Sequence, residues 1–379
     1  MHARPYATLE EATAGVSSAM GVSAQALIES FSPASEADLP AIIDLRQRVI
    51  GDWIGWDDEA YLRWRYRLGR AQQGQGECWV LRQHGRAIAI LGTEALTLRT
   101  RGVEIQAVRI MDLLVDVTHR HVGLTIWILL RMTHAHEAVM TLGSNANSRK
   151  LVGKLFKRLP DRIRWVANLR LGPPLHRRFP AMPKPLADLI ALPADMALHA
   201  WRQARHAPSA DLAVTREASV PPEAQRLHRS EQAPCGVGVV RTDAHWQWRL
   251  QSPRMKGHDI WCVRQRGALL GMLIVRHDRP THGAASWSVL DVVLGASEPD
   301  LALQVLLRGL FASAWRNRVT HIHWTVHRRD LTQALQGWGF VDRSDNFCTM
   351  SLHGKHAALL MAAEEGACWD IGEIHMDSD

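Results

Sequence analysis

The segment LLVDVTHRHVGLTIWILL, residues 113–130, places two histidines, an arginine and a glycine between two apolar stretches. The first stretch is typical of a buried strand and the second of a helix. A helix N-terminus has unpaired N–H groups and a partial positive charge. A cation such as Arg120 and a glycine such as Gly123 let backbone amides approach an anion closely. The segment RHVGLT, 120–125, therefore predicts a phosphate or pyrophosphate site.

The bulk composition is that of a two- or three-domain globular protein of 379 residues. Lys+Arg number 45 and Asp+Glu 38, a net charge of +7 that suits an anionic partner. The arginines are dispersed, which disfavours nucleic acid. Five widely spaced cysteines without a CxxC pair fit a reducing cytoplasm. We expect a cytoplasmic protein without a signal peptide or a membrane span, because no apolar run is long enough to cross a bilayer.

An internal repeat becomes visible when the two halves of the chain are aligned. YLRWRYRLG matches HWQWRLQSP, and CWVLRQHGRAIAILG matches IWCVRQRGALLGML. IMDLLV then matches VLDVVL, which places Asp112 on Asp291, and ILLRM matches VLLRG. The order of the matches is the same in both halves. The sequence therefore predicts two copies of one α/β unit.

The segment 113–130 also resembles the acetyl-CoA-binding segment of the GNAT N-acetyltransferases, in which Arg/Gln-x-x-Gly-x-Gly/Ala joins a strand to a helix. Arg120 and Gly123 occupy the first and fourth positions, whereas Thr125 stands where the family prefers Gly or Ala. FSPASEADLPAIIDL is similar to the family's first strand and helix, and LGSNANSRKLVGKLF to its late strand, asparagine and helix. The resemblance implies an α/β fold (α+β, with a mixed sheet) in two tandem domains.

The resemblance, the linker composition and the repeat together set the expected domain limits. We expect a flexible segment 1–28, a GNAT-like acetyl-CoA-binding domain 29–170, a Pro-rich basic linker with a bridging helix 171–210, a degenerate GNAT-like domain 211–355 and a tail 356–379. The second copy carries Glu298, Pro299 and Asp300 where the first has its cation and glycine. Two acids repel an anion, so we expect this copy not to bind the CoA pyrophosphate.

The resemblance implies acetyl-CoA as co-substrate. The residues implied to bind it are Leu114, Val115, Arg120, His121, Val122, Gly123, Leu124, Thr125 and Asn145.

Two carboxylates, Asp112 and Glu94, lie on strands that would flank the thioester in this fold, so they are catalytic candidates. The alternatives are a structural carboxylate paired with Arg109 for Asp112, and a solvated strand residue for Glu94. The tyrosine that often acts as general acid in the family is replaced by Val152.

Trp53 and Trp56 lie in a loop that would overhang the acceptor site, so they are candidates for substrate binding. The histidine pairs HAH and HIH do not indicate a metal site, because no third ligand has a suitable spacing. The expected activity is acetyl transfer to an amine of a small molecule or glycan. An aminoacyltransferase of the Fem type, which uses aminoacyl-tRNA, and a non-catalytic binding protein both remain open, as does the oligomeric state.

Overall fold

The computed structural model describes residues 8–51, 58–68, 77–143, 146–204, 211–230, 236–255, 257–281, 284–344 and 349–375. The chain forms two compact units. Unit 1 consists of Met1–Pro160, Ser252–Arg254 and Thr349–Gly366. Unit 2 consists of Asp161–Gln251, Met255–Cys348 and Ala367–Asp379. Each unit is therefore assembled from segments that are distant in sequence.

Unit 1 contains α-helices, short 3-10 helices (η) and strands in the following order: α1 (Leu9–Met20), α2 (Ala24–Ser30), β1 (Phe31–Pro33), η1 (Glu36–Asp38), α3 (Leu39–Ile50), α4 (Glu59–Tyr66), β2 (Cys78–Gln83), β3 (Arg86–Thr100), β4 (Val103–Val115), η2 (Val117–Val122), α5 (Leu124–Ala135), β5 (Ala138–Leu142), α6 (Ala146–Leu155), β6 (Lys157–Leu159), β15 (Met350–Gly354) and α13 (Ala357–Glu364).

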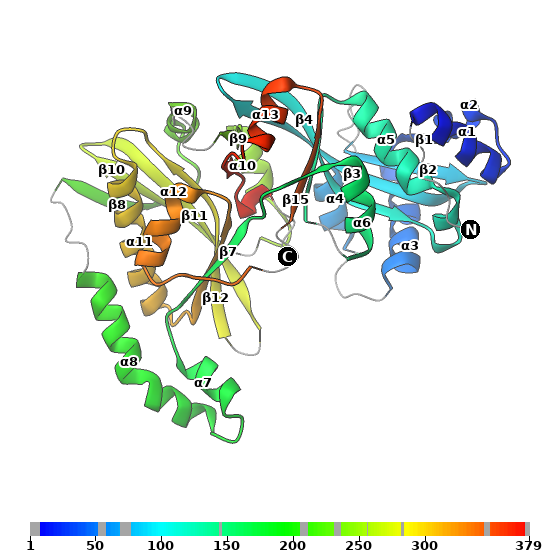
Figure 1. The fold of residues 1–379 in the computed structure, drawn as a ribbon. Coiled ribbons are helices and arrows are strands. Elements are labelled where there is room, and N and C mark those ends of the chain that lie inside the picture. Colours follow the sequence, from blue (N-terminus) through cyan, green and yellow to red (C-terminus); the bar gives the residue numbers. More distant parts are fainter. Residues whose placement is uncertain are drawn as a thin grey trace. The chain divides into compact units, whose positions relative to one another are not determined.

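The strands of unit 1 pair in the order β1-β2-β3-β4-β5-β15-β6. Only the β4–β5 pair is parallel; the other pairs are antiparallel. One apolar cluster joins α1, α2, α5 and α6 to the sheet, and a second joins α3 and α4 to it (Figure 1). The alternation of side chains along each strand explains this division, since Val80 lies in one cluster and Leu81 in the other. The sheet is thus covered by helices on both faces.

Helices α1 and α2 are packed against the rest of unit 1, where a flexible segment 1–28 was expected; residues 1–7 lie outside the described residues. Thr8 caps α1 through its side chain, and Gly21 ends the helix in a left-handed conformation. Val16 is fully buried, and the indole N–H of Trp127 in α5 donates to the Thr13 hydroxyl at 3.0 Å. The small residues that suggested disorder serve instead to bring α1 close to α5.

Unit 2 contains β7 (Ile163–Asn168), α7 (Gly172–Arg178), α8 (Lys184–Ala204), β8 (Leu212–Glu217), α9 (Glu223–Ser230), β9 (Val237–Val239), α10 (Asp243–Leu250), β10 (His258–Gln265), β11 (Ala268–Thr281), β12 (Ala284–Leu294), α11 (Pro299–Arg316), β13 (His321–Val326), α12 (Arg329–Gly337), β14 (Val341–Asp342), β16 (Trp369–Asp370) and η4 (Glu373–His375).

The main sheet of unit 2 has the order β8-β10-β11-β12-β13-β7-β14, with β12–β13 as its parallel pair. This is the strand order of unit 1, which confirms the predicted repeat. The hairpin turns also correspond, because His84-Gly85 and Arg266-Gly267 all have positive φ angles. In each sheet, the strand before the last is distant in sequence from its neighbours: β15 of unit 1 comes from near the C-terminus, and β7 of unit 2 comes from the start of that unit.

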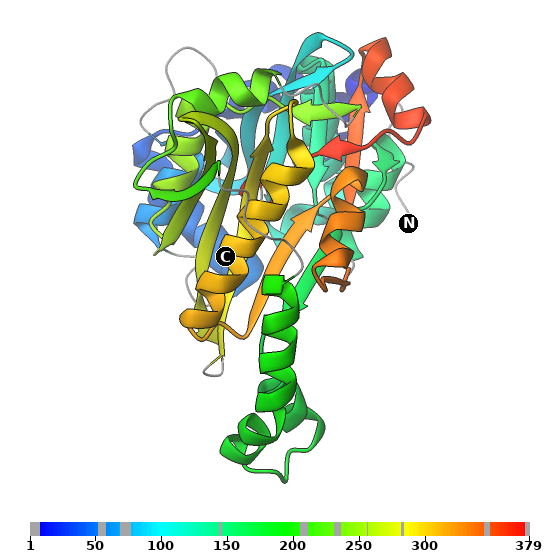
Figure 2. The same ribbon diagram turned by 90° about the vertical axis from the view of Figure 1, so that its left-hand side faces the viewer.

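The predicted linker 171–210 includes two helices of unit 2. Helices α7 and α8 form a hairpin, and Figure 2 shows it in green, projecting from the sheet of unit 2. Asp195 of α8 accepts a hydrogen bond from the backbone N–H of Leu171 at 2.8 Å. Within the described residues, no helix is both long and apolar enough to span a membrane.

Candidate functional site

Strands β4 and β5 separate before β4 ends. Their parallel pairing runs only from Ala107–Ala138 to Ile110–Thr141, whereas β4 continues to Val115. Within the described part of unit 1, no strand pairs with β4 on this side beyond Ile110. We call this stretch the open edge of β4. A strand edge of this kind suits an extended ligand, and here the Val115 carbonyl also accepts a hydrogen bond of 3.4 Å from the Arg120 side chain.

A β-bulge lies where the open edge begins. Gly92 of β3 pairs with Asp112, but the next residue, Thr93, pairs with Ile110, so Met111 is the extra residue. A bulge turns the backbone groups and side chains that follow it. Gly92 has a steric role here, because a Cβ on it would lie 2.7 Å from the Tyr66 ring.

The loop that follows β4 has the geometry expected of an anion site. Gly123 has φ 84° and ψ 10°, a left-handed conformation that favours glycine, and α5 begins at the next residue. No side chain caps α5, so its first-turn N–H groups are open to a ligand. Val122 and Leu124 are buried on either side of Gly123 and anchor the loop to the core.

Basic side chains surround this loop. Arg120 is exposed, and its Nε donates to the Val115 carbonyl at 3.4 Å, which ties the loop to the end of β4. Asp116 forms an ion pair with Arg48, so the nearby acid is neutralised. The pKa of His119 is lowered by partial burial and by neighbouring cations. The predicted cofactor-binding residues Leu114, Val115, Arg120, His121, Val122, Gly123, Leu124 and Thr125 therefore lie in one continuous stretch with basic side chains around it.

Asp112 lies beside the bulge as the centre of a hydrogen-bonded cluster. Its Oδ2 accepts bonds from Arg65 at 2.8 Å, from the Tyr66 hydroxyl at 2.6 Å and from Arg46 at 3.3 Å. Burial alone would raise the pKa of this carboxyl, but Arg65 and Arg46 outweigh it and lower the pKa to about 2. An acid with this pKa is a weak base at neutral pH. The geometry therefore favours a structural role for Asp112. The prediction that Arg109 would be its partner was wrong, because Arg65, Tyr66 and Arg46 bind it instead.

Arg109 pairs instead with Glu94. The two residues are directly opposite on β4 and β3, and their side chains approach to 3.0 Å while almost completely buried. Glu94 is thus not a solvated strand residue. The sequence held a signal for this pair, because a turn at Arg101-Gly102, both with positive φ, sets Glu94 opposite Arg109.

Three predicted site residues, Trp53, Trp56 and Asn145, lie outside the described residues. Val152, at the expected position of the general acid, is buried in the core on α6. Thr125 lies in the first turn of α5 and is half-buried. No group of three or more metal-ligating side chains occurs in the described ranges.

Unit 2 repeats the backbone geometry of unit 1 up to the same point. Its parallel pairing ends at Val289–Trp324, and Leu290 is the extra residue of a bulge just before Asp291. The helix that follows, α11, begins with Pro299, which has no N–H to donate, and Asp300 lies in its first turn.

The separation of β12 from β13 in unit 2 is filled by the chain itself. Residues 367–375 belong to the predicted tail 356–379, yet η4 packs against both strands. A Cβ on Gly372 would lie 2.9 Å from the Leu290 carbonyl, and Ile374 is buried in the same cluster as Leu290. Trp369, which is fully buried, forms a β-bridge with His327 just beyond β13.

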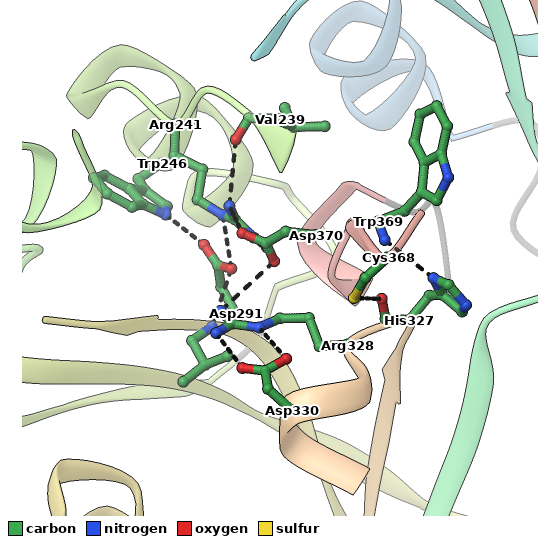
Figure 3. Close-up of polar contacts among 11 residues, drawn as sticks. Val239, Arg241, Trp246, Asp291, His327, Arg328, Asp330, Cys368, Trp369 and Asp370 are labelled. Atoms are coloured by element: carbon green, nitrogen blue, oxygen red, sulfur yellow. Dashed lines mark hydrogen bonds and ion pairs between the residues drawn. The ribbon is translucent and has the colours of Figure 1, made fainter. Parts of the chain in front are cut away.

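A buried ionic network holds this C-terminal segment (Figure 3). Arg241 donates to both oxygens of Asp370, at 2.7 and 3.0 Å, and to Asp291 at 2.9 Å. Burial alone would raise the pKa of Asp370, but Arg241 and Arg328 outweigh it and hold the pKa well below its ordinary value. Asp291, held by Arg241 and the Trp246 indole N–H, has a raised pKa because burial dominates. The two equivalent aspartates, Asp112 and Asp291, therefore have different surroundings.

Comparison with known proteins identifies the fold of this chain but no similar sequence. No family model and no curated protein sequence matches the chain. A GCN5-related N-acetyltransferase from Anabaena variabilis aligns over 88% of this chain and 74% of its own, with a TM-score of 0.61 at 11% identity. Saccharomyces cerevisiae N-myristoyltransferase with bound myristoyl-CoA aligns over 86% and 78%, with a TM-score of 0.53 at 13% identity. Eis1 from Mycobacterium abscessus aligns over 85% of this chain and 72% of its own, with a TM-score of 0.51 at 14% identity. Such identities establish the fold alone: the chain has the fold of the GCN5-related N-acetyltransferases.

Proposed function

We propose that the chain is an acyl-CoA-dependent N-acyltransferase whose single cofactor site lies in unit 1. The observation that carries the proposal is the contrast between two equivalent places. In unit 1, the open edge of β4 leads to a basic loop and an uncapped helix, α5. In unit 2, the same place is filled by residues 367–375 and followed by Pro299 and Asp300.

The residues of unit 1 fit the two parts of CoA. A pyrophosphate needs cations and open N–H groups, which Arg120, Gly123 and the first turn of α5 supply. The pantetheine arm is an extended amide chain, which suits the open edge between Leu113 and Val115, with Leu114 between them contributing its side chain. His121 is exposed on the same loop and is proposed to face the phosphates.

The proposed reaction is direct attack of an amine on the thioester carbonyl. A C–N bond forms, the C–S bond breaks and the thiolate leaves. Backbone N–H groups at the bulge are suited to stabilise the oxyanion, because their positions are fixed before reaction. Asp112, with a pKa of about 2, is assigned to holding the bulge, so we assign the amine's proton to water. Val152 cannot protonate the thiolate, which is a good leaving group without help.

For the acyl group and the acceptor, we propose chemical classes and not single compounds. Acetyl is the group that the motif resemblance implies, whereas the N-myristoyltransferase structure holds a myristoyl chain. A panel of acyl-CoAs of increasing length decides between them by relative kcat/KM. The acceptor is proposed to be an amine on a small molecule or glycan. Recognition by Trp53 and Trp56, and a cytoplasmic location, remain predictions.

Titration calorimetry of the full chain with acetyl-CoA tests the site. We expect one molecule per chain, and none in Gly123→Glu, since a carboxylate there repels the pyrophosphate. Gly102→Glu is a matched control, because Gly102 has a similar φ of 79° and nothing within 4 Å of its Cβ position. At 100 times its Kd, the ligand should stabilise the parent by about 2.7 kcal/mol. Two sites per chain, or equal effects of the two variants, would contradict the proposal.

The burial of Val152 favours one second candidate, a non-catalytic acyl-CoA-binding protein. This reading predicts the same stoichiometry but no turnover. Release of free CoA thiol in the presence of an amine library separates the two, since only the enzyme releases thiol faster than buffer alone. If tRNA binds the chain while acetyl-CoA does not, an aminoacyltransferase becomes the better interpretation.

A further inference from the structure

The hairpin of α7 and α8 presents apolar side chains to solvent over a long surface. Leu189 is 65% exposed, Ile190 53% and Phe179 51%. Leu186 and Met196 continue the same side of α8, at 45% and 57%. A helix in a globular protein normally turns its apolar side inward. Here the outward side is apolar, as is typical of a surface that meets another phase or molecule.

Basic side chains lie at the same end of the hairpin. Arg177 and Arg178 end α7, and Lys184 begins α8; all three are exposed. No acidic residue occurs in the sequence between Asp161 and Asp188. Asp188 is exposed, but it contacts Gly172, where a Cβ would collide with its carboxylate, and so it lies on the side of α8 that faces α7.

The end of the hairpin has a defined shape. The His176 ring bonds to the Met182 carbonyl at 2.8 Å, and the Met182 N–H donates to the Phe179 carbonyl at 3.0 Å. These bonds hold the five residues between the helices in one turn. The cations and the apolar side chains are therefore presented together, at an end that projects from the sheet of unit 2 (Figure 2). We call residues 176–190 the hairpin tip.

We propose that the hairpin tip binds the surface of an anionic lipid bilayer. Cations next to exposed Phe, Leu and Ile side chains suit the boundary between negatively charged headgroups and acyl chains. A second copy of the chain is a poorer partner. Both acids of α8, Asp188 and Asp195, face α7 or its start, so the outer side of α8 offers no carboxylate to another copy's cations. A nucleic acid would use the cations but leave the apolar side chains in water.

Co-sedimentation of the full chain with vesicles tests this proposal. The probes are vesicles of phosphatidylcholine alone and of phosphatidylcholine with phosphatidylglycerol. We expect binding only to the anionic vesicles, weakened by salt. Arg177→Ala with Arg178→Ala should lower the partition coefficient about 25-fold, at about fivefold per cation. Leu189→Ser with Ile190→Ser should lower it at least about tenfold, because two apolar side chains no longer enter the bilayer.

Leu360→Ser with Met361→Ser on α13 is the matched control, since these are also exposed apolar side chains on a helix. This variant should bind vesicles like the parent, and all variants should keep the parent's melting temperature. Equal binding to neutral and anionic vesicles, or no binding, would overturn the proposal. A dimer in light scattering that Leu189→Ser with Ile190→Ser dissociates would assign the tip to a second copy instead. Binding to tRNA that this variant leaves unchanged, without vesicle binding, would assign the cations to nucleic acid.

Discussion

Replacing Asp112 by Asn should destabilise unit 1 while leaving the chemistry of the folded protein largely intact. The carboxylate is the shared acceptor of Arg65, Tyr66 and Arg46, and only 10% of its side chain is exposed. Asparagine keeps the shape but removes the negative charge. Two buried guanidinium groups then lose the carboxylate that they share. If Asp112 were the catalytic base, the same change would instead abolish turnover without affecting stability.

The size of the effect follows from the pKa. A carboxyl with a pKa of about 2, in place of 3.8, is stabilised as an anion by about 2.5 kcal/mol. Removing one partner from a buried ionic cluster costs up to about 5 kcal/mol. For a domain of this size, each kcal/mol lowers the melting temperature by about 2–4 °C. We therefore expect a fall of about 5–20 °C in Asp112→Asn.

The pH dependence has a definite sign. Because the folded pKa lies below that of the unfolded chain, the stabilisation is complete above about pH 4 and is lost as the pH falls toward 2. The difference in unfolding free energy between the parent and Asp112→Asn should therefore shrink over that window.

Differential scanning calorimetry at pH 7 and at pH 2.5, together with CoA release at 20 °C, measures these quantities. Asp291→Asn in unit 2 is the matched control. Its carboxyl has a raised pKa, and Arg241 keeps Asp370 as a second partner, so the loss should be smaller. An Asp112→Asn protein with an unchanged melting temperature and a turnover more than 100-fold lower would refute the structural assignment.

Three further results are expected. Val152→Tyr should lower the melting temperature, because the site is buried, but change kcat less than tenfold, as measured by CoA release. Asp370→Ala should destabilise unit 2 by about 3–5 kcal/mol in urea unfolding, since Arg241 loses a bidentate partner; a change below 1 kcal/mol would contradict the network. Residues 1–160 alone should fail to give a cooperative thermal transition, whereas fusing residues 349–366 to them should restore one, because β15 then completes the sheet.

The sequence carried most of the local structure of both units. The repeated turn at His84-Gly85, the paired Asp112 and Asp291, and the glycine before α5 all lie within short segments whose conformation depends on near neighbours. Such features can be predicted from the sequence, because turn type and strand periodicity depend on only a few neighbouring residues.

The side-chain partners of the predicted site residues could not be predicted from the sequence in the same way. Asp112 meets Arg46 across 66 residues and Tyr66 across 46, and no local pattern encodes these distances. The C-terminal segment read as an acidic tail because Asp370 finds its partner, Arg241, 129 residues away. Its charge identified it as polar, whereas its burial depends on a pairing that only the folded chain provides.

The order of the strands along the chain explains why a copy without a cofactor site would persist. Strand β15, which pairs with β5 and β6 in unit 1, follows the two long segments of unit 2, Asp161–Gln251 and Met255–Cys348, in the sequence. Strand β7, which pairs with β13 and β14, lies at the start of the first segment of unit 2. Loss of the second copy would remove β15 and leave β5 and β6 with unpaired edges, which favour aggregation. Under the proposed function, unit 2 lacks an anion site and fills its own strand separation, yet deleting it would destabilise the fold of unit 1.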